Sequence, residues 1–191
     1  ELYPFQEEAL QDFVDNQLNV VLKSRQMGIS TLTAAYGLWL MTFHNDKNIL
    51  CISITQETAK EIVTKVRFAN DNLPSWLKVP CVEDNRLSLR LKNGSQIKAV
   101  SSAGTAGRSS ALSLLIIDEA AFIDGIEEIW LSAQYTLSTG GRAIVLSTPN
   151  GVGNFFHKTW VEAEEGKNNF KTIRLPWHLH PERDQAWRVL M

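Results

Sequence analysis

The strongest constraint on the fold of this chain is the alternation of short apolar runs with helical patterns. The most continuous run, Leu112–Asp118, has the composition of a buried central strand. Because strands that alternate with helices usually form parallel sheets, the pattern predicts an α/β domain with a mostly parallel sheet. Further strands are expected at Asn19–Lys23, Asn48–Ile54, Arg142–Ser147 and Phe170–Leu175, and helices at Glu7–Val14, Ser30–His44, Gln56–Asn70 and Phe155–Glu164.

A turn signal in the middle of the chain predicts a β-hairpin. The segments Arg86–Leu91 and Ser95–Val100 flank Asn93 and Gly94, a dipeptide typical of two-residue hairpin turns. We expect this hairpin to be added to the parallel sheet at its edge. The next segment, Ser101–Ser110, is rich in glycine, serine and alanine and is expected to be an exposed loop.

Composition predicts one globular domain without a strong global charge. The 191 residues, 44% hydrophobic and 21% charged, suffice for a sizeable core. The formal net charge of -2 argues against tight, static DNA binding, although it allows a local basic rim. Cys51 and Cys81 make neither a disulfide framework nor a metal site. No segment is apolar enough to span a membrane, and no signal peptide is evident, which favours an intracellular compartment.

The junction after the first predicted strand resembles a phosphate-binding loop. In the pattern G-x-x-x-x-G-K-S/T, Gly28 and Ser30 match, but Ile29 replaces the lysine and Lys23 replaces the first glycine. Backbone N–H groups of such loops bind phosphate oxygens. The alternative is a plain junction with a serine cap. The predicted nucleotide contacts are Ser24, Arg25, Gln26, Met27, Gly28, Ile29, Ser30 and Thr31, with Ser30, or less favourably Thr31, as a Mg²⁺ ligand.

The missing lysine requires a positive charge from another position. Lys23 ends the strand and begins the loop, so its side chain can fold back over the phosphates. Arg25 lies within the loop and can donate two hydrogen bonds to phosphate oxygens. We favour Lys23 as the functional lysine and Arg25 as a second phosphate or interface contact.

A second motif, LLIIDE, places two carboxylates after a buried strand. Asp118 and Glu119 follow four apolar residues, so they emerge at the end of the strand where ligands bind in open α/β sheets. This is the Walker B form, in which Asp118 holds Mg²⁺ and Glu119 deprotonates the attacking water. The alternative is that the two acidic residues stabilise the start of the next helix.

Three further features surround these motifs. Gln6 precedes a helical pattern, and a glutamine amide can recognise adenine, although a helix-start role is the simpler alternative. Ser147 and Thr148 belong to the turn STPNG, whose hydroxyls can sense the γ-phosphate; the alternative is a simple loop. Arg108 lies in the predicted exposed loop and is either a solubilising charge or an arginine finger.

Together the motifs LYPFQ, KSRQMGIS, LLIIDEAAF and LSTPNG resemble the ATPase domain of tailed-bacteriophage terminase large subunits. They span Gln6 to Gly151 in the order of that family. The resemblance implies a P-loop NTPase fold of the additional-strand (ASCE, RecA-like) type, a three-layer α/β sandwich with an added hairpin near residues 86–100. It also implies Asp118 as the metal-associated carboxylate, Glu119 as the catalytic glutamate and Gln6 as the adenine contact.

The resemblance bears on the other candidates as well. Some terminases carry their lysine early in the loop, which supports Lys23, and Ser147–Pro149 matches the coupling motif. Arg108 lies where related motors carry an arginine finger that reaches a neighbouring subunit, with Arg142 and Arg25 as rivals. The departure at Ile29 puts the efficiency of the isolated domain in question.

At the level of the whole protein, the resemblance implies a viral DNA-packaging motor. Its cofactors would be ATP and Mg²⁺, and its partners double-stranded DNA, the portal protein, the terminase small subunit and further copies in a ring. Residues 1–175 would form the ATPase domain and residues 176–191 the start of a linker toward an absent C-terminal nuclease domain. The fragment would be monomeric in isolation, and no membrane partner is expected. The site of action would be the cytoplasm of the infected bacterial host, with transient docking on the procapsid.

The main functional hypothesis is therefore a Mg²⁺-dependent ATPase that translocates double-stranded DNA. One alternative is a helicase-like DNA-remodelling ATPase, although no second RecA-like domain is evident and helicases keep the loop lysine. The other is a nucleotide-binding module without turnover, against which the presence of both Asp118 and Glu119 argues.

Overall fold

The computed structural model describes residues 1–101, 111–137 and 140–184. These ranges contain one eight-stranded sheet with the strand order β3-β4-β5-β2-β6-β7-β1-β8. All pairings from β5 to β8 are parallel, which confirms the predicted mostly parallel α/β sheet. The strands are β1 Leu18–Lys23, β2 Asn48–Ser53, β3 Cys81–Asn85, β4 Ser88–Leu91, β5 Gln96–Ser101, β6 Leu114–Asp118, β7 Arg142–Ser147 and β8 Phe170–Leu175.

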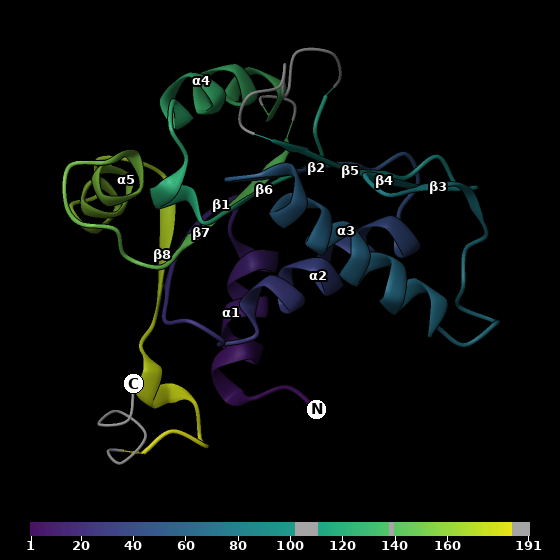
Figure 1. The fold of residues 1–191 in the computed structure, drawn as a ribbon, viewed down its shortest axis with the longest axis horizontal. Helices are drawn as coiled ribbons and strands as arrows, with labels where there is room; N and C mark the ends of the chain where they lie inside the picture. The colour runs from purple at the N-terminus through teal and green to yellow at the C-terminus, as the bar shows by residue number, and fades with distance from the viewer. Residues whose placement is uncertain (102–110, 138–139, 185–191) are drawn as a thin grey trace.

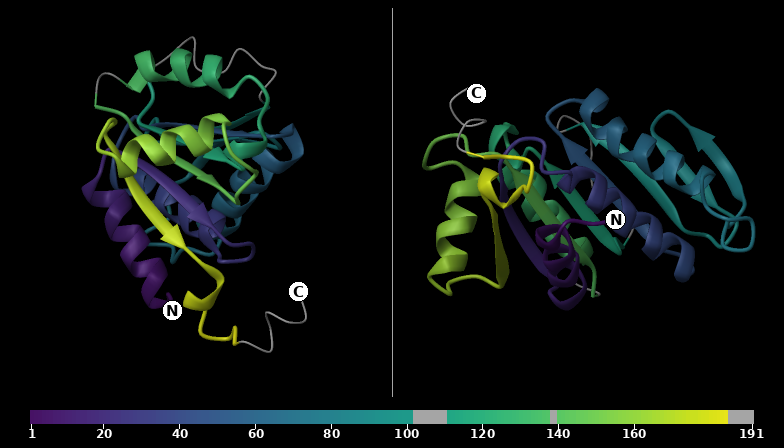
Figure 2. Two further views of the ribbon diagram at one scale, coloured as in Figure 1. Left: turned by 90° about the vertical axis from the view of Figure 1, so that its left-hand side faces the viewer. Right: turned by 90° about the horizontal axis from the view of Figure 1, so that it is seen from below.

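Helices cover both faces of this sheet and make a three-layer sandwich (Figures 1 and 2). Successive strand residues point to opposite faces, so each strand contributes to two cores. Val21 and Ile116 pack in the core under α1, α2 and α3, whereas Val20 and Ile117 pack in the core under α4 and α5. The helices are α1 Pro4–Asp15, α2 Ile29–Phe43, α3 Gln56–Asp71, α4 Ile126–Leu137 and α5 Phe155–Glu164, with short 3₁₀ turns η1 Ala120–Phe122 and η2 Trp177–Leu179.

The predicted boundaries agree well with the structure wherever the apolar pattern is strong. The bounds of β7, β8 and α5 are the predicted ones, and β1 and α2 each begin one residue earlier than predicted. Cys51 is fully buried in β2, as its apolar surroundings predict. Burial of alternating or consecutive apolar residues is therefore the signal that located these elements.

The predicted hairpin exists, but its predicted place at the sheet edge is wrong. Strands β4 and β5 pair antiparallel, and β5 continues into the parallel sheet by pairing with β2. The edge is formed instead by β3, which pairs with β4 and was not predicted. Every residue of β3 is exposed, so this strand has no alternation of buried and exposed residues that a sequence could reveal. Its pairing is held by backbone hydrogen bonds rather than by burial.

Helix α4 is also absent from the sequence-based prediction. It buries only Ile126, Ala133 and Leu137 against the sheet. Helix α1 also buries three residues and α5 two, so the number of buried positions does not explain why α4 was not predicted.

The strand order decides where the motif residues meet. Strand β7 lies between β1 and β6, with Leu22 beside Ser147 and Asp118 beside Leu146. This inserted strand matches the additional-strand fold that the resemblance implied. Because the three strands are parallel, the residues at their carboxyl ends lie along one edge of the sheet. Lys23 and Glu119 therefore flank the turn that follows β7.

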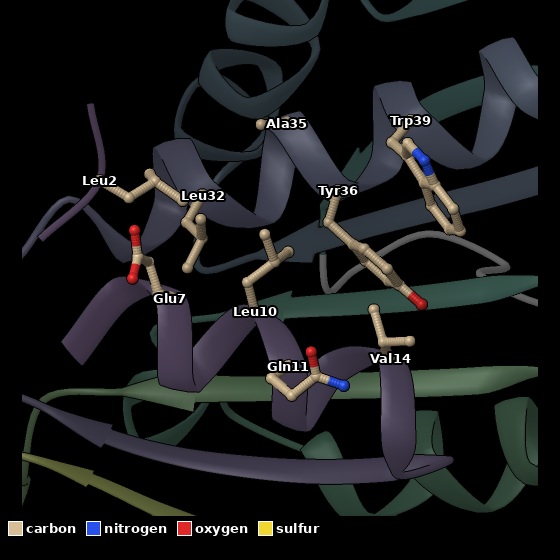
Figure 3. Close-up of a pocket in the computed structure, with 9 residues that line it drawn as sticks. All are labelled: Leu2, Glu7, Leu10, Gln11, Val14, Leu32, Ala35, Tyr36 and Trp39. Carbon is tan, nitrogen blue, oxygen red and sulfur yellow. The ribbon is translucent and has the colours of Figure 1, made fainter. Parts of the chain in front are cut away.

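Helices α1 and α2 enclose an apolar groove of about 500 Å³ (Figure 3). Trp39 and Val14 are partly exposed there, and none of the lining residues belongs to the phosphate-binding loop or to the Asp118–Glu119 pair. The groove is lined by Leu2, Glu7, Leu10, Gln11, Val14, Leu32, Ala35, Tyr36 and Trp39.

None of the described helices has the length and apolar content needed to cross a membrane.

Phe13 is expected to be a main contributor to stability. Its ring is 1% exposed and packs 6.0 Å from the ring of Tyr36, measured between centroids. Phe13→Ala should lower the free energy of unfolding by about 3–5 kcal/mol, because the truncation leaves a cavity in the core. The neighbouring Val14→Ala, at an exposed position, should cost less than about 1 kcal/mol. Urea denaturation of both variants tests this, and equal losses would contradict it.

Candidate nucleotide-binding site

The loop between β1 and α2 has the backbone geometry of an anion-binding site. Gln26 and Gly28 both adopt the left-handed region, with φ of 57° and 74°. Gly28 is the N-cap residue of α2, and no side chain caps this helix. Backbone N–H groups in such a turn, together with an uncapped helix N-terminus, attract negatively charged oxygens.

Ile29 stands at the position of the standard loop lysine, and the structure explains why it is apolar. Its side chain is 1% exposed and belongs to the core beneath α1, α2 and α3. A lysine with the same orientation would place its charge in an apolar cluster at a high desolvation cost. The positive charge for phosphates must therefore come from another position.

Lys23 brings such a charge against the two carboxylates that follow β6. It is 8% exposed, and its Nζ donates to Glu119 Oε1 at 2.7 Å and lies 3.8 Å from Asp118 Oδ1. Burial alone would raise the pKa of Glu119, but the hydrogen bond and charge of Lys23, with hydrogen bonds from Thr148, hold the pKa below its ordinary value. Burial dominates at Asp118 and raises its pKa, against the opposing effects of Lys23 and Ser30.

Ser30 and Asp118 present two oxygen atoms side by side. The Ser30 hydroxyl donates to Asp118 Oδ2 at 2.9 Å and does not cap α2, contrary to the simpler alternative. A hydroxyl and a carboxylate are hard oxygen donors that suit Mg²⁺, which keeps waters and substrate phosphates as its other ligands. Among the described residues, no group of three or more His, Cys, Asp or Glu side chains could hold a metal ion. By their hard oxygen donors, Ser30 and Asp118 fit a Mg²⁺ ion whose other ligands are waters and phosphate oxygens.

The turn after β7 holds the second oxygen of Glu119. The backbone N–H and the hydroxyl of Thr148 each donate to Glu119 Oε2 at 3.2 Å, and the Ser147 hydroxyl lies 3.4 Å from the same atom. Ser147 Oγ also accepts from the Ala121 N–H at 3.1 Å. Asn150 donates to the Ala121 carbonyl at 2.9 Å. The STPNG turn therefore orients Glu119, whose own backbone is left-handed with φ of 54°.

The sequence that forms this site matches a known protein family. The family described as "Terminase large subunit, T4likevirus-type, N-terminal" matches residues 20–186, which is most of the chain and includes the whole charge cluster. This chain belongs to the terminase large subunit family. The predicted resemblance and the predicted fold are thereby confirmed.

Individual relatives agree with this assignment. The terminase chain is 26% identical over 212 residues to the "Probable terminase, large subunit gp28" of Escherichia phage Mu, with 91% of this chain and 37% of that protein covered. It therefore spans little more than a third of that relative. The large terminase ATPase domain of Thermus phage P74-26 has a TM-score of 0.78 at 21% identity, covering 100% of this chain and 87% of that one. A large terminase from a thermophilic bacteriophage, in complex with ATP-gamma-S, has a TM-score of 0.76 at 13% identity, covering 100% and 48%.

In the terminase domain, Gln6 links the start of α1 to the phosphate-binding loop. Its Oε1 accepts from the Tyr3 N–H at 3.1 Å, which is the helix-start role named as the alternative. Its Nε2 also donates to the Met27 carbonyl at 3.0 Å. The Gln6 amide therefore contacts the loop backbone, and its contact with adenine stays a prediction.

Among the described residues, the other predicted ones form no hydrogen bond or ion pair with Asp118 or Glu119. Arg25 is exposed, and its side chain makes no hydrogen bond or ion pair with any described residue. The Ser24 N–H donates to the Leu175 carbonyl, which ties the loop to β8. Arg142 donates to backbone carbonyls of α1 and the following turn, at the opposite edge of the sheet. Arg108 lies outside the described residues. Met27 is buried and Thr31 is exposed in the first turn of α2.

Sequence reasoning missed Arg183 as a neighbour of the terminase loop. Its guanidinium donates to the carbonyl oxygens of Arg25 at 3.0 Å and Gln26 at 2.9 Å. Its segment, HPERD (residues 180–184), is polar and has the composition of a connecting segment. No local pattern could have revealed a contact with a loop 158 residues away.

Gly28→Ala should weaken nucleotide binding by about tenfold or more, because a non-glycine residue in the left-handed region costs about 1–2 kcal/mol. An added Cβ would also lie 2.6 Å from Gln6 Nε2 and displace the amide that holds Met27. Titration with a non-hydrolysable ATP analogue measures the effect. Gly166→Ala is the matched control, since Gly166 has a φ of 69° but open space around it. Equal affinity in wild type and Gly28→Ala would contradict the assignment of the loop.

Proposed function

We propose that this terminase domain hydrolyses ATP with Mg²⁺ and uses the energy to translocate double-stranded DNA into a procapsid. One observation carries the proposal. Lys23, Ser30, Asp118 and Glu119 converge within hydrogen-bond or ion-pair distance at the end of β1 and β6, beside the anion-binding loop.

In this proposal, backbone N–H groups of the loop and of the α2 N-terminus bind the β- and γ-phosphates of ATP. Lys23 supplies the charge that Ile29 does not, by turning its Nζ from Glu119 toward the phosphate oxygens. Ser30 and Asp118 hold the metal ion. When bound, Mg²⁺ neutralises negative charge on the phosphate oxygens.

Glu119 is the proposed general base. An ordinary glutamate is ionised at neutral pH, and the hydrogen bonds from Thr148, which remain when Lys23 turns to the phosphates, favour the ionised form and fix the orientation of one oxygen. The attacking water gives its proton to Glu119 while its oxygen bonds to the γ-phosphorus, and the bond to the ADP oxygen breaks. The products are ADP and inorganic phosphate.

The wider role is proposed from family membership. Partners would be double-stranded DNA, the portal protein, the terminase small subunit and further copies in a ring, working in the cytoplasm of the infected bacterial host. An arginine from a neighbouring subunit, with Arg108 as the first candidate, would complete the site. Residues 1–175 are proposed as the motor domain and residues 176–191 as the start of a linker, with nuclease activity assigned to a further domain.

A nucleotide-binding module without turnover is the main alternative. The ion pair between Lys23 and Glu119 favours this alternative, because an amine that is bonded to the Glu119 carboxylate does not contact a phosphate. Steady-state hydrolysis measurements separate the two functions. Binding of ATP with no release of phosphate would overturn the ATPase proposal for this domain.

Removal of Mg²⁺ should lower the rate of ATP hydrolysis by about 100-fold or more. The metal contributes several kcal/mol of charge stabilisation, and each 1.36 kcal/mol changes the rate about tenfold. Phosphate release is measured with excess EDTA and again after Mg²⁺ is restored. Full activity in EDTA would contradict the assignment of Ser30 and Asp118 as metal ligands.

A further inference from the structure

Side chains from outside the phosphate-binding loop bind three of its consecutive carbonyl groups. Arg183 donates from Nη1 to the Arg25 oxygen at 3.0 Å and from Nη2 to the Gln26 oxygen at 2.9 Å. Gln6 Nε2 donates to the Met27 oxygen at 3.0 Å. Nη1 of Arg183 also lies 3.3 Å from the Met27 sulfur. The carbonyl side of the loop is thus held by two side chains.

This arrangement determines where the loop N–H groups point. In a planar trans peptide the C=O and the following N–H point in opposite directions. The carbonyls of Arg25, Gln26 and Met27 point toward the side chains of Arg183 and Gln6. The N–H group that follows each carbonyl therefore points away from these two side chains. Those N–H groups are the donors that a phosphate-binding loop uses.

The two Arg183 bonds also stabilise a strained residue. Gln26 has a φ of 57°, and a non-glycine residue in this region is unfavourable unless surrounding contacts support it. The bonded carbonyls lie immediately before and after the Gln26 Cα atom. Arg183 therefore holds both peptide planes that flank the strained position.

The segment that carries Arg183 is itself anchored on the start of α1. The Tyr3 hydroxyl donates to Glu182 Oε1 at 3.3 Å, and the Tyr3 ring lies 4.8 Å from the His180 ring, measured between centroids. The Arg183 N–H donates to the His180 carbonyl at 3.0 Å. Figure 2 shows the yellow segment around η2 beside the purple start of α1. The two residues that hold the loop carbonyls, Arg183 and Gln6, thus come from one contact between the two ends of the described chain.

We propose that Arg183 is a positioning residue for nucleotide phosphates, which acts by holding the carbonyls of Arg25 and Gln26 so that the loop N–H groups face the phosphates. This inference rests on the proposed function for its effect on turnover. It requires the forked guanidinium rather than positive charge alone, because one planar group must bond two carbonyls at once. A lysine, as a point charge, cannot reproduce that geometry.

The first experiment needs no nucleotide. Backbone amide hydrogen exchange is measured for the peptide that contains residues 24–28 in wild type, Arg183→Ala and Arg183→Lys. Arg90→Ala, at an exposed arginine on β4, is the control. The amide that reports on the loop is that of Ser24, which donates to the Leu175 carbonyl. Arg183→Ala should speed its exchange by about tenfold or more and leave β4 unchanged, because losing the charge-assisted bonds to the Arg25 and Gln26 carbonyls makes local opening of the loop more frequent. Unchanged exchange in Arg183→Ala would overturn the proposal, whatever the protein does with ATP.

The second experiment separates positioning from a general role in folding. Because the loop binds phosphate in the ground state and in the transition state alike, its disruption should raise the Kd for ADP and the KM for ATP by roughly 10–100-fold and change kcat by less than about threefold. Arg183→Lys should remain within about threefold of Arg183→Ala. Lower kcat with unchanged KM and a lower urea midpoint would indicate folding alone, and full rescue by lysine would indicate charge alone; either result overturns the proposal. A wild type that binds ADP without hydrolysing ATP would overturn the proposed function, while the exchange rates and the ADP Kd still decide the role of Arg183.

Discussion

Glu119→Gln should reduce ATP turnover by about 10²–10⁴-fold, the usual contribution of a general base, while ATP binding persists. The amide keeps the size of the side chain and can still accept the hydrogen bonds from Thr148 to Oε2. It cannot take a proton from water. Because the amide is neutral, Asp118 is the remaining carboxylate near Lys23, with 3.8 Å between Lys23 Nζ and Asp118 Oδ1. The Lys23 amine can then turn more easily toward the phosphates. Single-turnover hydrolysis and titration with an ATP analogue measure the two effects separately.

The matched control is Glu128→Gln, at an exposed position on α4 that carries the same change of charge. Its turnover should match wild type within about twofold, because substitutions at exposed positions outside the site have little effect. A Glu119→Gln protein that still turns over ATP near the wild-type rate would remove Glu119 from the mechanism. Loss of ATP binding in the same variant would instead indicate that the carboxylate maintains the loop.

Lys23→Ala should lower kcat by about 10²–10³-fold, the loss typical when one preorganised donor to a developing charge is removed. The physical reason is that position 29 cannot supply the charge, since Ile29 is buried in the core. Removing Lys23 also leaves Asp118 and Glu119 next to each other without their shared cation. The like-charge repulsion weakens the site further and should lower the thermal midpoint of the domain.

Two comparisons make this result specific to Lys23. Lys158→Ala removes an exposed lysine from α5 and should change neither kcat nor the thermal midpoint measurably. Arg25→Ala tests the rival for the same role. Because the Arg25 side chain is exposed and forms no hydrogen bond or ion pair with either carboxylate, its loss should change kcat by less than about threefold in the isolated domain. A larger effect for Arg25→Ala than for Lys23→Ala would reverse the assignment.

Much of the fold was predictable because buried positions in strands and helices are occupied by apolar residues at a regular spacing. Elements such as β7 and α5 have continuous or periodic apolar positions, and their predicted bounds are correct. Strand β3 lacks that pattern, because it is exposed throughout. Without β3, the hairpin is expected to be the last pair of strands, which is why its place at the sheet edge is wrongly predicted.

The site was predictable to the level of motifs but not of contacts. Spacing alone identified the loop around Gly28 and the pair of carboxylates after β6. It left open whether Lys23 or Arg25 supplies the missing charge. The structure places the Lys23 amine on Glu119 and leaves the Arg25 side chain exposed, an arrangement that supports Lys23.

The sequence by itself determined the fold class, which depends on burial along single elements, and indicated the family through the resemblance of its motifs to those of terminase large subunits. Only the tertiary structure decided which side chains meet. Lys23 reaches Glu119 because β7 is inserted between β1 and β6 and brings three strand ends to one edge of the sheet. Arg183 reaches the loop because the segment after β8 packs against the start of α1. Both contacts join residues distant in the chain, and no local pattern encodes such a pairing.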